Sequence, residues 1–300
     1  MERAGAVPAQ SDLFRHGFVP ALLLGAAVAW SARAPLESFL LAHALRVDVV
    51  TLVLLAAMVV LFVAERVRPR EPSWNYNVGR TGALGVARFL RDFIYLLFVT
   101  QLSALLIRAA ALRLEPALRG RAHFWPHAAP FALRALLAFL AVELCSYWLH
   151  RASHHTRLLW QFHSTHHVVE ELSSLKALRT HPVDNLLYYL VRNAPLLLLG
   201  AGADEVLTVT CFGTLLSLLA HANLDVAEGV LGWFINFPRY HAVHHSADVS
   251  QSRANYGCHT IVWDRLFGTF REEPAPTLGT RPLGHRTLWQ ELIAPFYRAM

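Results

Sequence analysis

The spacing of its histidines is the feature that most constrains what this chain can be. Nine of the 17 histidines fall in residues 150–167 and 241–245, where an even distribution over 300 residues would place about one. They include three boxes, H-x-x-x-H once and H-x-x-H-H twice, formed by His150 and His154, by His163, His166 and His167, and by His241, His244 and His245. Positions i, i+3 and i+4 of a helix share one face. Each box is therefore predicted to point its imidazoles in one direction, as metal ligation requires.

The boxes favour a site for two metal ions. Neutral imidazole is a suitable ligand for zinc, copper, iron and nickel. Structural zinc sites usually include thiolates, whereas Cys145, Cys211 and Cys258 lie far apart in the sequence and form no C-x-x-C pair. Eight box histidines are too many for one tetrahedral ion, so two ions fit the number of ligands better.

Three further histidines are candidates for ligation. His221 and His181 stand at turn-like places, where each either completes a coordination sphere or caps a helix. We expect His221 to ligate, because it follows an apolar stretch at the point where the chain returns to the side of the boxes. His155 is adjacent to His154 and points about 100° away on a helix, which favours a supporting role. The isolated histidines are expected to be ordinary core residues, namely His16, His43, His123, His127, His259 and His285.

A few carboxylates lie close to the boxes in sequence. A metal-bound histidine usually donates its other ring N–H to a carboxylate or carbonyl oxygen. Glu143, seven residues before His150, and Asp184 and Asp248 are therefore candidates for orienting the ligands. The alternative is that each is an ordinary polar flank or helix cap.

The composition indicates a membrane protein. Hydrophobic residues make up 55% of the chain and charged residues 16%, with a mean hydropathy of +0.35, which is too apolar for an ordinary soluble fold. Four membrane crossings are predicted at 18–30, 47–64, 89–112 and 131–149, the first needing its flanks to reach spanning length. The stretches 186–200 and 205–220 are shorter and predict a membrane-dipping helical hairpin. We therefore expect an all-α integral membrane bundle, with about four spans and this hairpin, under a histidine-rich two-metal cap.

Charge indicates how the bundle is oriented. The net charge is +6 and is carried almost wholly by arginine, which favours contact with anionic lipid over nucleic-acid binding. The segment 65–91 is rich in arginine and is predicted to be cytoplasmic by the positive-inside rule. An even number of crossings before His150 then places the boxes in the cytoplasm as well. The N-terminus lacks the order of a signal peptide, so the first apolar run is expected to be retained.

Hydrolase chemistry finds no support in the motifs. A zincin needs H-E-x-x-H with glutamate as general base, but the second residue of the boxes is Arg151, Ser164 or Ala242. The sequence has no G-x-S-x-G, no Gly-rich phosphate loop and no dinucleotide fingerprint. Electrons and organic cofactors bound through such loops are therefore expected from another protein.

The motifs in their order resemble the fatty acid hydroxylase/sterol desaturase superfamily of integral membrane di-metal oxygenases. The resemblance covers about residues 140–270, with the first two boxes beginning 13 residues apart, unlike those of acyl-CoA desaturases. It is carried by His150-Arg151-x-x-His154, Phe162-His163-x-x-His166-His167, His181-Pro182-x-Asp184, His221-Ala222-Asn223, Arg239-Tyr240-His241-x-x-His244-His245, Asn255-Tyr256-Gly257 and the closing run Trp263-Asp264-Arg265-Leu266-Phe267-Gly268-Thr269.

The resemblance implies a di-iron centre, O₂ as oxidant and a membrane lipid as substrate. The expected reaction is hydroxylation of a fatty acyl, alkyl or sterol carbon; desaturation at the same site is an alternative, and a non-enzymatic metal carrier or sensor is another. With no cytochrome b5-like or flavin-binding region, electrons are expected from a separate cytochrome b5-, ferredoxin- or reductase-like partner. The composition favours a bacterial cytoplasmic membrane, the endoplasmic reticulum being the eukaryotic counterpart. No oligomeric state is predicted.

The resemblance also suggests a division of the chain. Residues 1–130 are expected to be membrane helices and connectors, 131–272 a fatty acid hydroxylase-like catalytic domain, and 273–300 a peripheral tail. Aromatic residues are interleaved around the boxes, and each is expected either to belong to an interfacial belt or to line a channel for the lipid. These are Tyr147, Trp148, Trp160, Phe162, Trp233, Phe234, Phe237 and Tyr240.

Overall fold

The described part of the chain is helical. A computed structural model describes residues 12–43, 48–75, 124–280 and 288–297, together with scattered positions between 86 and 113. Its α-helices are α1 (Asp12–Ser31), α2 (Arg33–Ala42), α3 (Val49–Val67), α6 (Phe131–His155), α7 (Arg157–His167), α8 (Pro182–Leu199), α9 (Ala203–Ala220), α10 (Pro238–His244), α11 (Val249–Ser252), α12 (Val262–Leu266) and α13 (Leu288–Tyr297). Short 3₁₀ helices are η1 (Pro72–Trp74), η2 (Ser174–Leu178) and η3 (Gly229–Trp233). Extended pairing in these residues is limited to isolated bridges, so the all-α prediction is confirmed.

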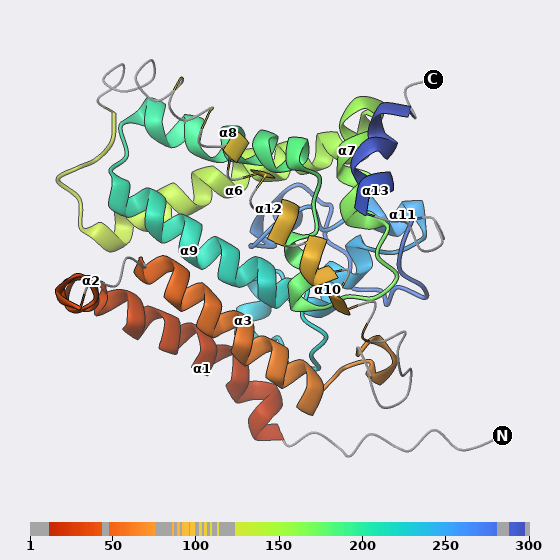
Figure 1. Cartoon of the computed structure of the whole chain (residues 1–300), viewed down its shortest axis with the longest axis horizontal. Helices are drawn as coiled ribbons and strands as arrows, with labels where there is room; N and C mark the ends of the chain where they lie inside the picture. Colours follow the sequence, from red (N-terminus) through yellow and green to blue (C-terminus); the bar gives the residue numbers. More distant parts are fainter. Residues whose placement is uncertain are drawn as a thin grey trace.

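Four of these helices, α1, α3, α6 and α9, are long and apolar enough to cross a membrane. The runs predicted at 18–30, 47–64 and 131–149 correspond to α1, α3 and α6, and flanking residues extend α1 to 20 residues. Of the crossing predicted at 89–112, the structure describes only scattered positions, and these are helical. The long helices run alongside one another, and the short helices α7 and α10–α13 gather at one end as a cap (Figure 1).

The end of α3 attaches the membrane bundle to the cap. Asp48 begins the helix by accepting the backbone N–H of Thr51, which satisfies one of the free amides of the first turn. At the other end Glu65 is buried and accepts hydrogen bonds from the N–H groups of Ser174 and Asn223 and from the Ser174 hydroxyl. Glu65 thus lies in the last turn of the membrane helix α3 and is buried there. The polar connector predicted from residue 65 begins a few residues later.

The helices α8 and α9 form the expected helical hairpin. Gly200 ends α8 in the left-handed region at φ 86°, which glycine adopts without strain. The hairpin is open, because both helices pack against α6, which lies between them (Figure 1). Its two free ends carry His181 and His221 back to the cap. With 18 residues, α9 is longer than the predicted segment and reaches spanning length.

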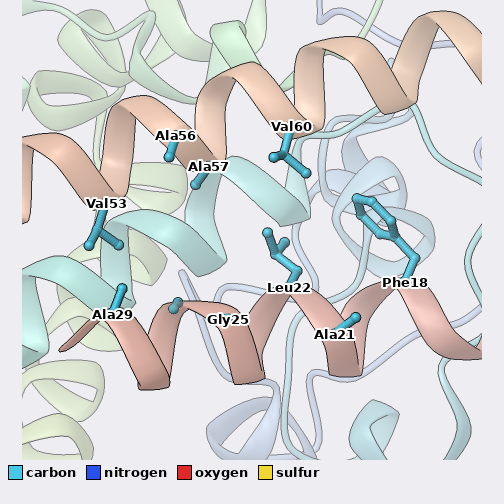
Figure 2. A pocket seen from close by; sticks show the side chains of 10 residues that line it. Phe18, Ala21, Leu22, Gly25, Ala29, Val53, Ala56, Ala57 and Val60 are labelled. Carbon is cyan, nitrogen blue, oxygen red and sulfur yellow. The ribbon is translucent and has the colours of Figure 1, made fainter. Parts of the chain in front are cut away.

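An apolar groove of about 340 Å³ lies between α1 and α3. Small side chains on the facing surfaces, such as Gly25, Ala29 and Ala57, leave this space open (Figure 2). Hydrocarbon lining is what a helix face in a bilayer requires. The groove therefore agrees with a membrane position for both helices.

The C-terminal helix α13 belongs to the cap. It packs against α7, the helix of the second box. Its Glu291 forms a buried ion pair with Arg179, and its Leu292 carbonyl lies 3.1 Å from His181 Nε2. The described part of the segment expected to be a peripheral tail therefore supports the cap directly.

Candidate metal centre

The structure gathers nine buried histidines into two neighbouring groups. Within each group, one ring nitrogen per residue lies within 4.8 Å of all the others. The five-histidine group contains His150, His154, His163, His167 and His244, and the four-histidine group contains His166, His221, His241 and His245. The rings of His167 and His245 stack with centroids 4.4 Å apart, so the two groups adjoin. The nine residues are the eight box histidines and His221.

The sequence predicted that each box points its imidazoles in one direction. For the two H-x-x-H-H boxes this prediction is wrong. The second box sends His163 and His167 to the five-histidine group and His166 to the other. The third box divides as well, with His244 in the first group and His241 and His245 in the second. Residues i and i+4 share a face, whereas adjacent residues differ by about 100° around the helix. Each of these boxes therefore joins the two groups.

The spacing of the ring nitrogens fits metal ligation. The closest Nε2–Nε2 distances are 2.9 Å for His150–His244 and His221–His241, 3.0 Å for His166–His221, and 3.1 Å for His163–His167 and His241–His245. Two ligand atoms, each about 2.1 Å from one ion, lie about 3.0 Å apart at a right angle and about 3.4 Å apart at a tetrahedral angle. The observed distances match the right angle. This favours ions with five or six ligands over a tetrahedral zinc site.

Hydrogen bonds at Nδ1 turn Nε2 of several rings towards the centre of each group. His163 Nδ1 lies 3.0 Å from Asp184 Oδ2. Backbone carbonyls accept from four other rings: Tyr256 O from His150 at 2.6 Å, Ala254 O from His244 at 2.7 Å, Ser217 O from His221 at 2.8 Å and Arg179 O from His166 at 3.2 Å. A proton on Nδ1 leaves Nε2 unprotonated in a neutral ring. That is the tautomer that binds metal through Nε2.

Burial keeps the cap histidines neutral. It lowers the pKa of His166 to about 4 and that of His244 to about 3. Burial first, and then the neighbouring imidazoles, also lower the pKa of His167, His221, His241 and His245. Imidazole must be neutral to bind a metal, so these rings are ready for ligation at neutral pH.

The three candidate carboxylates have different positions. Asp184 contacts His163, as described above. Glu143 is buried but accepts hydrogen bonds from the backbone of His259 and Thr260 and from the His259 ring. It therefore holds His259, a buried histidine outside both groups. Asp248 is exposed and accepts the N–H of Ser250 as the N-cap of α11. This carboxylate does not orient a ligand in the structure, because its local helix cap points it to solvent.

The two less central histidines lie outside both groups. His181 is the N-cap of α8, where its Nδ1 accepts the N–H of Val183 at 3.1 Å. Its other nitrogen faces α13. The structure thus agrees with the capping alternative for His181. His155 points away from the groups, as expected from its position next to His154, and its Nε2 lies 3.0 Å from the Tyr256 hydroxyl.

Comparison with known proteins agrees with this geometry. The sequence model of the fatty acid hydroxylase family matches residues 135–269. The ornithine lipid hydroxylase OlsE of Rhizobium tropici is 31% identical over 249 residues, which cover 82% of this chain and 75% of that protein. The chain belongs to the fatty acid hydroxylase family. This makes it an integral membrane oxidoreductase.

More distant members of the family match only in part. The alkylglycerol monooxygenase of Danio rerio is 33% identical over 158 residues, 51% of this chain and 34% of that protein. The very-long-chain aldehyde decarbonylase GL1-6 of Oryza sativa subsp. indica is 30% identical over 160 residues, 48% of this chain and 24% of that protein. No solved structure matches. This family member thus spans only about a quarter to a third of the length of these two longer relatives.

The loop at 254–260 positions ligands in a way that was not predicted. Its carbonyls at Ala254 and Tyr256 are the acceptors for His244 and His150 described above. Asp264 is fully buried and accepts the N–H groups of Tyr256 and Gly257, each at 2.7 Å. Burial raises the pKa of Asp264 to about 6. The signal available in the sequence was the pair of motifs around Asn255 and Trp263, but spacing alone shows no contact between them.

Close packing holds the same loop in place. A Cβ at Gly257 would come within 1.8 Å of the Thr260 carbonyl oxygen, so no larger residue fits there. Asn255 adopts the left-handed region at φ 52°, and its side-chain amide donates to the carbonyls of Tyr240 and Arg271. Asn236 donates to the Gly257 carbonyl and lies 3.2 Å from His241 Nδ1. The loop therefore contacts two histidines of the five-histidine group directly and His241 of the other group through Asn236.

A cavity of about 130 Å³ adjoins both groups. Histidines of the two groups and residues of η2, α8 and α9 are among those that line it. Its lining includes Tyr188, Arg192 and Cys258. The eight aromatic residues expected in a belt or channel do not line this cavity. Three of them, Tyr147, Phe237 and Tyr240, are buried elsewhere, whereas Trp148, Trp233 and Phe234 are exposed.

Proposed function

We propose that this chain is a di-iron, O₂-dependent hydroxylase of a membrane lipid. The observation that carries the proposal is the pair of adjoining all-histidine groups, nine residues in total, which share one cavity beside the membrane helices. Histidine ligands without thiolate, spaced for five or six ligands per ion, suit iron. Relatives in the family are named as a lipid hydroxylase and as monooxygenases, which supports the same chemistry here.

In this proposal the nine grouped histidines hold the two ions, and the Nδ1 contacts of His150, His163 and His244 fix the ring orientations. When bound, the irons supply the O₂-activating chemistry that the side chains lack. The protein binds the lipid with one C–H bond beside the groups and excludes bulk water. In the overall reaction one oxygen atom enters the C–H bond and the other leaves as water. Two protons and two electrons are consumed, and a separate redox protein of cytochrome b5, ferredoxin or reductase type supplies the electrons.

We further propose that residues 131–272 form the catalytic domain, between a membrane region at 1–130 and a tail at 273–300 whose helix α13 packs against the cap. The segment that matches the family lies within this domain. The two histidine groups are proposed to face the cytoplasm of a bacterial cell. Support comes from Arg66, Arg68 and Arg70, which follow the buried end of α3 at the cap side, because basic residues concentrate on the cytoplasmic side.

Cysteines introduced by Arg70→Cys, Glu170→Cys and Asp248→Cys are expected to react with a membrane-impermeant thiol reagent from one common side, the cytoplasm. These positions follow α3, the second box and the third box. Labelling is measured on inside-out and right-side-out vesicles, and the unsubstituted chain gives the background from its three native cysteines. Opposite accessibility of positions 170 and 248 would contradict the hairpin arrangement and the shared site.

The function itself is tested by lipid analysis of cells grown under ¹⁸O₂ with and without the gene. We expect at least one ¹⁸O-labelled hydroxylipid that depends on the gene and disappears in a His241→Ala variant. A gene-dependent unsaturated lipid without label would instead identify a desaturase with the same site. If box variants change only the cellular metal content, the metal-carrier alternative replaces the proposal. The compact, buried arrangement of the ligands disfavours that alternative, because a carrier needs ligands along a path.

A further inference from the structure

The cavity beside the metal groups is small. Its volume of about 130 Å³ is well below the volume of about 340 Å³ of the groove between α1 and α3. Such a space holds a short piece of a lipid, a few heavy atoms long, next to the histidines. Only the few lipid atoms next to the reacting carbon therefore fit in the cavity. The chemistry of the cavity lining indicates what kind of atoms these are.

Tyr188, Arg192 and Cys258 form a polar wall of the cavity, which an alkyl chain does not require. Tyr188 reaches this wall from α8, with its ring 6.2 Å from that of His150 and 6.3 Å from that of His163. Its hydroxyl is shielded from solvent and meets no oxygen or nitrogen partner among the described residues; its one polar neighbour is the Cys258 thiol, a weak hydrogen-bonding group. A buried hydroxyl with only a thiol beside it is poorly satisfied. A ligand oxygen in the cavity would be a stronger partner.

The neighbours of Tyr188 make the wall a donor surface. Arg192 lies one helical turn along α8, with its guanidinium 4.9 Å from the Tyr188 ring centroid. Arg192 Nε donates to the Ser146 hydroxyl at 3.0 Å, and the buried Glu143 carboxylate offsets its charge. The Cys258 thiol lies 3.9 Å from His150 Nδ1 on the same wall. A donor surface with a balanced charge suits a neutral acceptor oxygen better than an anion.

We propose that the cavity binds the polar linkage of the lipid, with Tyr188 donating a hydrogen bond to a carbonyl, ether or hydroxyl oxygen of the substrate. This rests on the proposed function and specifies its substrate. The oxidised carbon then lies within a few bonds of that oxygen, in the head group or at its junction with the hydrocarbon. Oxidation in the middle or at the far end of an acyl chain would place only CH₂ groups against Tyr188 and leave its hydroxyl with the Cys258 thiol as its one polar neighbour. Sites built around a substrate hydrogen bond discriminate strongly against ligands that lack the partner.

The position of the label in the product tests the inference. Lipids from cells that express the chain under ¹⁸O₂ are fragmented in a mass spectrometer, and the ¹⁸O atom is assigned to a fragment. We expect it in the fragment that contains the head group or its linkage. Label in a remote part of an acyl chain overturns the inference and leaves the proposed function intact. Absence of any gene-dependent labelled lipid overturns both.

A variant tests the role of Tyr188. In membranes that contain Tyr188→Phe, the initial rate of ¹⁸O incorporation into the host lipids is expected to fall roughly 10- to 100-fold, in line with the loss of one buried hydrogen bond to substrate. The purified variant should keep the metal content of the unsubstituted protein, because the hydroxyl lies outside both histidine groups. The matched control Tyr189→Phe alters the next residue on α8, which does not line the cavity, and should keep the full rate. An unchanged rate in Tyr188→Phe, or a rate loss that follows metal loss, contradicts the inference.

Discussion

Replacing one histidine of each group, as in His166→Ala with His244→Ala, is expected to remove both metal ions and abolish oxygen incorporation into lipid. Each ring supplies a nitrogen about 3 Å from a neighbouring ligand nitrogen, with His166 next to His221 and His244 next to His150. The unsubstituted protein should hold two ions per chain. Metal analysis of purified protein in detergent, with the protein concentration from amino-acid analysis, measures the ratio.

Two histidine variants serve as matched controls for this experiment. His155→Ala and His43→Ala each remove an imidazole outside both groups and should leave two ions bound, since His155 contacts the Tyr256 hydroxyl and His43 is an exposed residue at the end of α2. A reproducible single ion in the unsubstituted protein, or full metal content in the double variant, would exclude the two-metal site. Zinc recovered after overexpression would not, because zinc binds nitrogen sites more tightly than ferrous iron.

Asp264→Asn is expected to weaken metal binding although Asp264 contacts none of the nine grouped histidines. The amide offers one acceptor oxygen where the carboxylate offers two, so the N–H of Tyr256 or of Gly257 loses its partner. A buried N–H without a partner costs about 1–3 kcal/mol. The loop would then shift the carbonyls that orient His150 and His244. Changes of this kind usually lower metal affinity roughly 10- to 100-fold, which competition with a chelator measures.

The control for this variant is Asp248→Asn, which changes an exposed carboxylate in the same way. Asp248 caps the short helix α11, so the variant should lower stability by no more than about 1 kcal/mol and leave metal affinity unchanged. Equal effects of the two substitutions on metal affinity would show that the loop at 254–260 does not position the ligands. Loss of folded protein in Asp264→Asn alone, with unchanged affinity in the folded fraction, would limit Asp264 to a structural role.

Local patterns in the sequence determined the class of fold and which histidines gather in the two groups. Apolar runs of spanning length predicted α1, α3 and α6, because the thickness of the hydrocarbon core and the rise per residue of a helix together set the number of residues in a span. Histidine spacing predicted the eight box residues, and the return of an apolar stretch towards the boxes predicted His221. These inferences depend on residues a few positions apart in the chain, and helix geometry fixes how far apart such residues lie in space.

The tertiary structure alone decided how these residues combine. The division of each H-x-x-H-H box between two groups depends on how α7 and α10 approach α6 and the end of α9. His181 caps a helix and Asp248 faces solvent, although both stand as close to the boxes in sequence as residues that do contact them. Asp264 accepts hydrogen bonds from the loop at 254–260, and the Tyr188 ring lies beside those of His150 and His163, which come from other helices. Such contacts arise when helices pack, and no periodicity along the chain encodes them.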